Sequence, residues 1–461
     1  MSFLFHFLLL VGLGLLVERP IWEGSPGELI AWFDEPASLD SAAGEQTADP
    51  ILLPPSPSEG DAPRIDQRIV VPGIAAVERQ PADKTDFRRA ASGFRPTDPV
   101  DWLMQTDAAV GGSLAGRRGD ARSALAKIGG GTDQSERAVE RGLRWLMAHQ
   151  CDDGSWNFDH NKSICRGQCG NPGSEASTTA ATAIALLSFL GAGYTHREGE
   201  YQEQIKRGLY YLGSRALLTQ HGTDLQEGTM YGQGLAAIAL CEAYAMTGDT
   251  ALRPLAQGAI DFIVSAQDQR GGGWRYGPGE PGDATVTGWQ LMGLKSGQMA
   301  GLTVPSPTIF MVQRFLSSVQ RDGGSQYGYM DSSPRNSTTA IGLLCRMYTG
   351  WRQNHPGLQR GVVYLSNWGP SEDDIYYDYY ATQVLHHWGG RLWEEWNAKM
   401  RDYLIGVQAA TSHEAGSWFF PKDRGAAKGG RIYCTAMAVM TLEVYYRYLP
   451  LYGSQSVEGE F

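Results

Sequence analysis

Apolar positions along the chain follow a helical spacing that glycine-rich turns interrupt at regular intervals. The recurring unit is an aromatic residue, then Leu or Ile, then three further residues and a Gln, at the end of an amphipathic stretch. Four copies keep the Gln: Trp145-Leu146 with Gln150, Phe262-Ile263 with Gln267, Phe315-Leu316 with Gln320, and Tyr403-Leu404 with Gln408. Two more keep the aromatic pair alone: Tyr211-Leu212 and Tyr364-Leu365. Spacing of about 50 residues predicts a repeat array.

Three of the copies with Gln run directly into a Gly-x-Trp turn. These turns end at Trp156, Trp274 and Trp418, whereas the Phe315 copy continues into RDGGSQYGY. A Gln amide can bind backbone groups left free at a helix end, and an indole can stack beneath it. We therefore interpret these residues as structural connections between neighbouring repeats and not as catalytic groups.

A second, more uniformly apolar stretch follows each glycine-rich turn. The six stretches are ASTTAATAIALLSFL, MYGQGLAAIALCEAY, TVTGWQLMGLKSG, NSTTAIGLLCRMY, YYATQVLHHW and IYCTAMAVMTLEVYYRY. Helices that are apolar nearly all round are buried, so these are predicted to lie inside and the more charged first helices outside. The sequence thus predicts an all-α fold of six outer–inner helix pairs.

The Gln and the Gly-x-Trp turn together resemble the repeat of squalene–hopene and oxidosqualene cyclases, which protein prenyltransferase β subunits share more loosely. The resemblance covers about residues 125 to 452, and stretches such as TMYGQGLAAIALCEAYAMTGD also resemble planctomycete proteins with prenyltransferase and squalene oxidase repeats. It implies a closed α/α toroid, with six inner and six outer helices and a cavity that opens at one end of the inner ring.

The signatures of the known activities of this fold are missing from the sequence. The cyclases protonate an alkene with an Asp-x-Asp-Asp-Thr-Ala stretch, but the Thr-Ala pairs at Thr339 and Thr435 have no acid before them and that at Thr179 has only Glu175. The prenyltransferase zinc motif Asp-x-Cys is absent, since Ile432 stands two residues before Cys434. The Cys-Gly-Glu-Gln thioester of complement-type toroids is absent too. The resemblance therefore predicts the fold without these activities.

Acids and aromatics gather at the starts of the predicted inner helices. Because these helices all run the same way, the side chains are predicted around one rim. The weak candidates for a catalytic acid are Glu175, Asp283 and Asp374. The candidates for ligand binding at the rim are Glu227, Tyr231, Thr287, Trp289, Asp378, Tyr379 and Tyr380. Helix capping is the alternative interpretation of each acid.

These observations lead to three hypotheses about function. The first is an exported or membrane-anchored toroid that binds a small molecule, glycan or peptide in its central cavity, without cyclase or prenyltransferase activity. The second is a terpenoid-processing enzyme with a substitute acid. The third is a polysaccharide-active enzyme that uses paired rim carboxylates. No cofactor is predicted.

Composition and charge divide the chain into a long N-terminal part and the toroid. The apolar run at residues 3–17 would span about 22 Å as a helix, short of a bilayer core of about 30 Å. Residues 1–17 are therefore predicted to be a signal peptide or short membrane anchor, residues 18–120 a disordered acidic, Pro-rich linker, residues 121–452 the toroid and residues 453–461 a tail. The linker holds much of the net charge of -11, so no nucleic-acid surface is predicted.

Five of the six cysteines separate into two kinds. Cys241, Cys345 and Cys434 lie in apolar helical stretches and are predicted to be core residues. Cys165 and Cys169 lie four residues apart in a polar loop, which suits a local disulfide in an exported protein or plain thiols. A metal site of this pair with Cys151 and His160 is the less favoured alternative, because the spacing matches no strong zinc pattern. No metal site is predicted.

Overall fold

The computed structural model describes residues 112–452 of the chain. The predicted signal or anchor segment, most of the predicted linker and the predicted tail lie outside the described residues. Within residues 112–452, no helix combines the length and the apolar character needed to cross a membrane.

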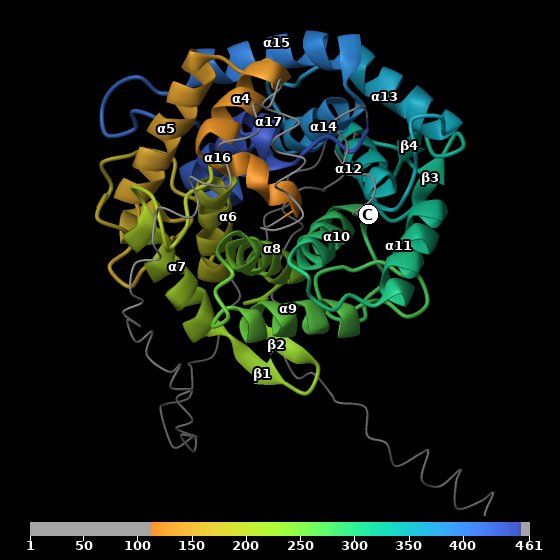
Figure 1. The fold of residues 1–461 in the computed structure, drawn as a ribbon, viewed down its shortest axis with the longest axis horizontal. Coiled ribbons are helices and arrows are strands. Elements are labelled where there is room, and N and C mark those ends of the chain that lie inside the picture. Colours follow the sequence, from red (N-terminus) through yellow and green to blue (C-terminus); the bar gives the residue numbers. More distant parts are fainter. Residues whose placement is uncertain (1–111, 453–461) are drawn as a thin grey trace, which may run out of the picture.

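Two concentric rings of helices make up the fold (Figure 1). The outer helices are α5 (Asp133–Ala148), α7 (Gln202–Arg215), α9 (Arg253–Ser265), α11 (Ser306–Val319), α13 (Pro356–Trp368) and α15 (Gly390–Val407). The inner helices are α6 (Thr178–Gly191), α8 (Met230–Thr247), α10 (Ala284–Met299), α12 (Asn336–Tyr348), α14 (Ile375–Trp388) and α16 (Ala426–Leu442). The prediction of an α/α toroid with six inner and six outer helices is confirmed.

The fold also contains four short helical elements and two short β-hairpins within the described residues. The helical ones are η1 (Gly112–Arg117), α4 (Gly119–Gly129), η2 (His160–Lys162) and α17 (Val444–Arg447). Two antiparallel hairpins pair β1 (Leu217–Thr219) with β2 (Gly222–Asp224) and β3 (Gln320–Arg321) with β4 (Gln326–Tyr327). In Figure 1, α4 and α17 lie within the outer ring, and the β1–β2 hairpin projects beyond α9.

The two kinds of helix differ in burial as their sequences predict. Along α6 every residue from Thr179 to Gly191 is buried, because the helix contacts neighbours on all sides. Helix α5 buries one stripe, which includes Val139, Leu143 and Leu146, and leaves its charged face to solvent. Burial of one such apolar side chain stabilises the fold by about 1.5–3 kcal/mol. The inner ring therefore supplies most of the core.

The three Gly-x-Trp tryptophans occupy equivalent positions in the ring. Each indole is at most 1% exposed and donates its Nε1–H to the last turn of the preceding outer helix, with acceptors Leu146, Ile263 and Leu404 at 2.7–2.8 Å. The backbone N–H of each tryptophan donates a hydrogen bond to a threonine hydroxyl on the following inner helix. These threonines are Thr182, Thr287 and Thr435. The turn thus joins one outer helix to its inner partner.

The glutamines of the three Gly-x-Trp copies each join their own repeat to the next one around the ring. Gln150 donates from Nε2 to the carbonyl of Gln204 on α7 at 2.9 Å, and Gln267 donates to Thr308 on α11 at 3.0 Å. Gln408, in the last repeat, donates to Ala138 on α5 at 2.9 Å. This last bond closes the ring between its final and first repeats. The predicted structural role is thus confirmed for Gln150, Gln267 and Gln408.

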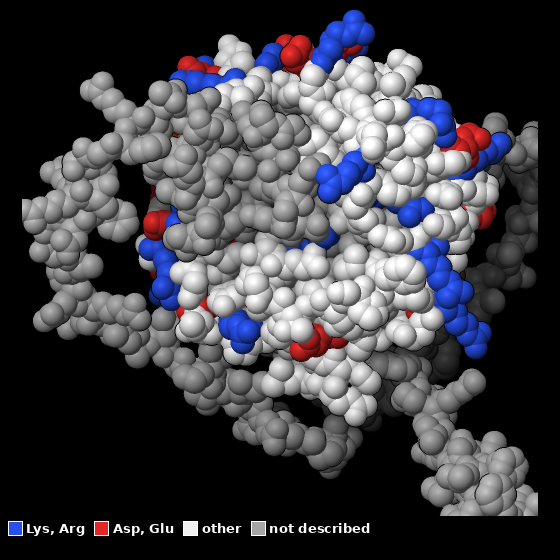
Figure 2. Space-filling view, turned by 45° about the vertical axis from the view of Figure 1, so that its right-hand side comes forward, with Lys and Arg blue, Asp and Glu red and all other residues white. Residues whose placement is uncertain are grey.

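Charged side chains are dispersed over the described surface that Figure 2 shows, with basic and acidic groups close together. Uncharged residues separate most of these charged groups on the described part of this face.

Candidate functional site

We call the pole of the toroid where the inner helices begin the mouth. Two of the acids predicted there, Asp283 and Asp374, are N-cap residues of inner helices. Asp283 precedes α10, and its Oδ1 accepts hydrogen bonds from the Val286 N–H and the Thr285 hydroxyl, both at 2.8 Å. Asp374 precedes α14 and accepts from the Tyr377 N–H at 2.8 Å. Asp283 is completely buried, and this burial raises the pKa of its carboxyl to about 6.

Asp423, which was not among the predicted residues, joins the starts of two inner helices. Its carboxylate accepts from the Ile375 N–H of α14 at 3.0 Å and from the Gly425 N–H before α16 at 2.8 Å. Burial, together with the nearby charge of Asp374, raises the pKa of Asp423 to about 7. Asp423 lies three residues before α16, near the position that Asp283 takes immediately before α10, so the segment just before an inner helix was the signal in the sequence.

Asp378 completes a group of three acids with Asp374 and Asp423. Its side chain is 0% exposed, and its Oδ1 accepts from the Ser371 N–H at 2.8 Å. Burial raises the pKa of Asp378 well above its ordinary value, and the charges of Asp374 and Asp423 add to that shift. We name these residues the acid cluster. Within it, Asp378 and Asp423 retain protons at pH values where exposed carboxyls have lost them.

The Asp378→Asn substitution is expected to reduce the loss of stability with rising pH. In the unfolded chain Asp378 ionises above a pKa of about 3.9, whereas the folded chain keeps the proton. The wild-type free energy of unfolding therefore falls as pH rises from about 4 towards the folded pKa, by up to about 1.4 kcal/mol per pH unit. Urea unfolding at pH 5 and pH 7 measures this slope.

The exposed Asp373 provides the matched control in the same connection. Asp373→Asn should leave the slope close to that of the wild type. An unchanged slope in Asp378→Asn would show that Asp378 is ionised in the folded chain.

Aromatic side chains fill the axis of the toroid between α10 and α14. Trp289 stacks on Tyr379 with ring centroids 5.8 Å apart, and it contacts Tyr380 edge to face at the same distance. Tyr380 lies 5.1 Å from Tyr376 and 5.2 Å from Tyr379. All four side chains are at most 2% exposed. The structure thus places Trp289, Tyr379 and Tyr380 in a packed interior and not on the open rim that the sequence predicted.

Glu227, another predicted rim residue, binds polar groups at the start of α6. It accepts hydrogen bonds from the Thr179 N–H at 2.6 Å and the Thr178 hydroxyl at 3.0 Å, and it pairs with Arg215 at 2.9 Å. Burial favours the protonated form, but these bonds outweigh it and lower the pKa of Glu227. Glu227 is therefore an anion at neutral pH.

The remaining predicted residues also have structural partners. Glu175 accepts a hydrogen bond from the N–H of Ala176 in the segment that runs beside the start of α16. The Tyr231 hydroxyl lies 2.7 Å from that of Thr285 and is buried. The Thr287 hydroxyl accepts a hydrogen bond from the backbone N–H of Trp274, as described above.

An open groove of about 650 Å³ lies at the mouth beside the β1–β2 hairpin. We name it the mouth groove; its charged lining residues are Arg215, Asp224, Glu227 and Glu280. Leu217, 65% exposed, lines the same groove. Among the described residues of its lining, none is aromatic. Three carboxylates against one guanidinium make it an anionic surface.

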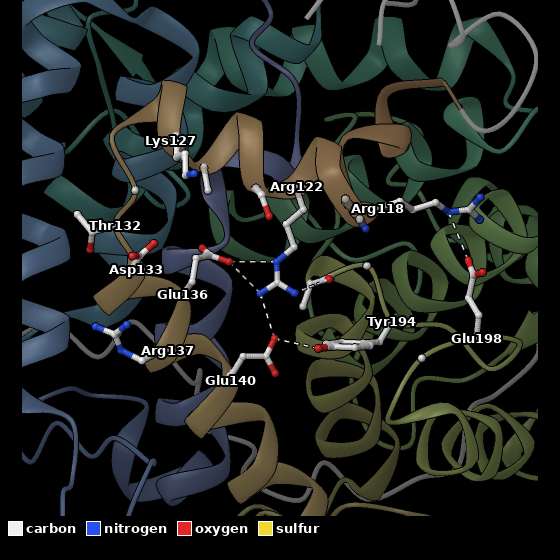
Figure 3. Close-up of a pocket in the computed structure, with 18 residues that line it drawn as sticks. Arg118, Arg122, Lys127, Thr132, Asp133, Glu136, Arg137, Glu140, Tyr194 and Glu198 are labelled. Carbon is white, nitrogen blue, oxygen red and sulfur yellow. Dashed lines mark hydrogen bonds and ion pairs between the residues drawn. The ribbon is translucent and has the colours of Figure 1, made fainter. Parts of the chain in front are cut away.

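A larger groove of about 790 Å³ lies at the opposite pole between α4, α5 and the connection after α6 (Figure 3). Arg122 points into its centre and pairs with Glu136 at 2.9 Å and Glu140 at 3.2 Å. Glu140 also accepts from the Tyr194 hydroxyl at 2.9 Å. Because these charges already neutralise one another, this groove offers less unbalanced charge to a ligand than the mouth groove.

Residues 118–238 match the family model described as the squalene-hopene cyclase C-terminal domain. The chain contains a squalene cyclase-like α/α toroid. The resemblance predicted from the glutamine and Gly-x-Trp motifs is confirmed. No curated protein matches the sequence of this squalene cyclase-like chain.

Solved structures similar to the squalene cyclase-like toroid belong to proteins of different activities. A variant of the type II terpene cyclase MstE from Scytonema, in complex with merosterolic acid A, is 14% identical with a TM-score of 0.48, over 68% of this chain and 97% of that chain. An inactive variant of an α-1,6-mannanase from Salegentibacter, in complex with α-1,6-mannotetrose, is 10% identical with a TM-score of 0.49, over 68% and 99%. Such likenesses concern the fold and not the activity of this chain.

Proposed function

We propose that the squalene cyclase-like toroid is a binding domain that does not cyclise terpenoids. The packing of the axis carries this proposal. A cyclase encloses its polyprenyl substrate in the inner ring, but Trp289 and the tyrosines of α14 contact one another there and are at most 2% exposed. The missing Asp-x-Asp-Asp-Thr-Ala stretch supports the same conclusion.

We propose further that the mouth groove binds a basic segment of another polypeptide. The groove carries Asp224, Glu227 and Glu280 against Arg215, and the exposed Leu217 offers an apolar contact beside them. Sugar-binding sites commonly stack an aromatic ring on the sugar, whereas none of the described residues that line the mouth groove is aromatic. Charge and lining therefore favour a cationic peptide over a glycan.

The Glu280→Lys substitution is expected to weaken binding of a Lys- and Arg-rich decapeptide about 3- to 10-fold. Glu280 is exposed, so the change replaces an attraction of about 0.2–1 kcal/mol by a similar repulsion. Titration calorimetry at low and high salt measures it, and the wild-type affinity should fall as salt rises.

Glu395→Lys is the matched control, because Glu395 is an exposed acid on outer helix α15. It should bind the peptide as the wild type does. Equal affinity of Glu280→Lys and wild type, or binding of soluble manno- or gluco-oligosaccharides in place of the peptide, would contradict the proposal. Oligosaccharide binding would favour the polysaccharide-active alternative.

The acid cluster supports a second candidate function, a terpenoid-processing enzyme with a substitute acid. Alkene protonation requires a carboxyl that keeps its proton more firmly than an exposed one, and burial raises the pKa of Asp378 well above its ordinary value and that of Asp423 to about 7. Incubation with squalene and with geranylgeranyl diphosphate separates the two functions. We expect no product; a cyclised product from the wild type that Asp378→Asn abolishes would establish the second function.

Location in the cell envelope is also a proposal. It rests on the apolar run at residues 3–17, which lies outside the described residues. Fractionation of cells that express the full chain tests it, and recovery of the intact N-terminus in the cytosol would contradict it.

A further inference from the structure

Four side chains with metal-binding atoms converge where the first and last repeats meet. They are His149 at the end of α5, Cys165 and Cys169 in the connection to α6, and His413 in the connection from α15 to α16. Their ligand atoms all lie within 4.8 Å of one another. Cys169 Sγ is 3.3 Å from His149 Nε2 and 3.1 Å from His413 Nδ1, and Cys165 Sγ is 3.6 Å from His413 Nδ1.

These separations match the edges of a tetrahedral zinc site. With Zn–S about 2.3 Å and Zn–N about 2.0–2.1 Å, neighbouring sulfur and nitrogen ligands lie about 3.6 Å apart. The longest separation of 4.8 Å requires shifts of about 1 Å. Two sulfur and two imidazole ligands form a set that binds zinc.

Neighbouring groups already orient the ligands. The Nδ1 of His149 lies 2.6 Å from the Trp145 carbonyl, which leaves Nε2 to face the sulfurs. The Trp145 indole stacks on His149 at 3.8 Å and donates its N–H to the His413 carbonyl at 3.2 Å. The Cys169 N–H donates to Cys165 Sγ at 3.3 Å. One tryptophan thus positions both histidines.

The backbone of the connection folds so that both cysteines point to the same place. Arg166 and Gly167 have φ of 47° and 81°, and this left-handed turn brings Cys169 back over Cys165. Cys165, Cys169 and His149 are at most 4% exposed, whereas His413 is exposed and gives an ion access from solvent.

We infer that His149, Cys165, Cys169 and His413 bind one zinc ion that fastens the first repeat to the last. The ion displaces one proton from each thiol, and its two charges neutralise the two thiolates, while the imidazoles stay neutral. Four protein ligands leave no open position for substrate, so the role is structural.

This proposal differs from the sequence prediction of no metal site; of the two alternatives predicted for Cys165 and Cys169, a disulfide or plain thiols, the structure has plain thiols. The cysteines are free in the structure. His160, the partner considered from the sequence, contacts the Cys169 carbonyl at 3.3 Å, and Cys151 is not in the group.

Metal analysis of the full chain, purified without a histidine tag or chelator, tests the site. We expect one zinc per chain in the wild type and loss of that zinc in Cys169→Ser and in His413→Gln. Cys151→Ser is the matched control and should keep the zinc, since Cys151 lies in the same connection but outside the group. Because His413 is exposed, its variant should fold, which circular dichroism checks.

Cobalt substitution identifies the ligands. Co²⁺ added to the metal-free chain should give the intense visible bands of a tetrahedral ion and a sulfur charge-transfer band, both lost in Cys169→Ser. Zinc-free wild-type protein whose Cys165 and Cys169 resist alkylation until reductant is added would overturn the inference in favour of a disulfide. A cobalt spectrum without the sulfur band would also overturn it. Neither result bears on the mouth groove.

Discussion

Replacement of Glu242 by Gln is expected to lower the free energy of unfolding by about 3–5 kcal/mol. Glu242 on α8 pairs with Arg117 of η1 at 2.7 Å and with Arg447 of α17 at 3.6 Å. The three side chains are at most 1% exposed. The substitution leaves two buried guanidinium groups without their shared carboxylate. Urea unfolding at pH 7 measures the change.

The effect of this substitution should depend on pH. Burial favours the neutral acid, but Arg117 and Arg447 outweigh it and lower the folded pKa of Glu242 below its ordinary value. The stability that this carboxylate contributes is therefore present above pH of about 4.3 and is lost as pH falls through the folded pKa. Wild type and Glu242→Gln should converge in stability in acid.

An exposed acid supplies the comparison for Glu242. Glu395 pairs with Arg391 at 3.5 Å, with the two side chains 54% and 82% exposed. Glu395→Gln should change the free energy of unfolding by less than about 0.5 kcal/mol. Equal effects of the two substitutions would show that the buried network does not hold the pole of the toroid together.

The Trp418→Ala substitution is expected to cost about 3–5 kcal/mol of stability. Its indole is 0% exposed and donates to the Leu404 carbonyl at 2.7 Å. The ring packs against Gly142 of α5, where an added Cβ would lie only 2.9 Å from the indole. The substitution leaves a cavity and an unpaired carbonyl at the closure of the ring. Thermal and urea unfolding both measure the loss.

Trp368 is the matched control for Trp418. It ends outer helix α13 and is 60% exposed. Trp368→Ala should change stability by no more than about 0.5 kcal/mol. A loss in Trp418→Ala as small as this would mean that the Gly-x-Trp turns do not join the helices.

The fold was predictable because its determinants are local and repeated. Each of the three complete copies places its glutamine, glycine and tryptophan within about a dozen residues, and the aromatic pair recurs in all six copies, so the period could be read directly. The copy at Phe315 departs from the pattern: Gln320 accepts a hydrogen bond from Arg346 at 2.9 Å, and Tyr327 stands where the other turns have Trp. Even this copy keeps the helix pair.

The candidate site was less predictable because its contacts are distant in sequence. Asp423 binds a backbone group 48 residues away, and His413 meets Cys169 across 244 residues. Burial was a second difficulty. Tyr376, Tyr379 and Tyr380 share one helix face at spacings of three and four, which identifies the face but not whether it meets solvent or a neighbouring ring.

The glutamine bond that closes the ring has the same form as those between consecutive repeats. Gln408 reaches the carbonyl of Ala138 as Gln150 reaches that of Gln204. The junction between the last and first repeats therefore has the same glutamine bond as two junctions that the chain also connects. Because the same bond is made with and without a chain connection, the ring does not require the termini to lie at one particular junction. A circularly permuted chain, with its termini between two other repeats, would keep these bonds.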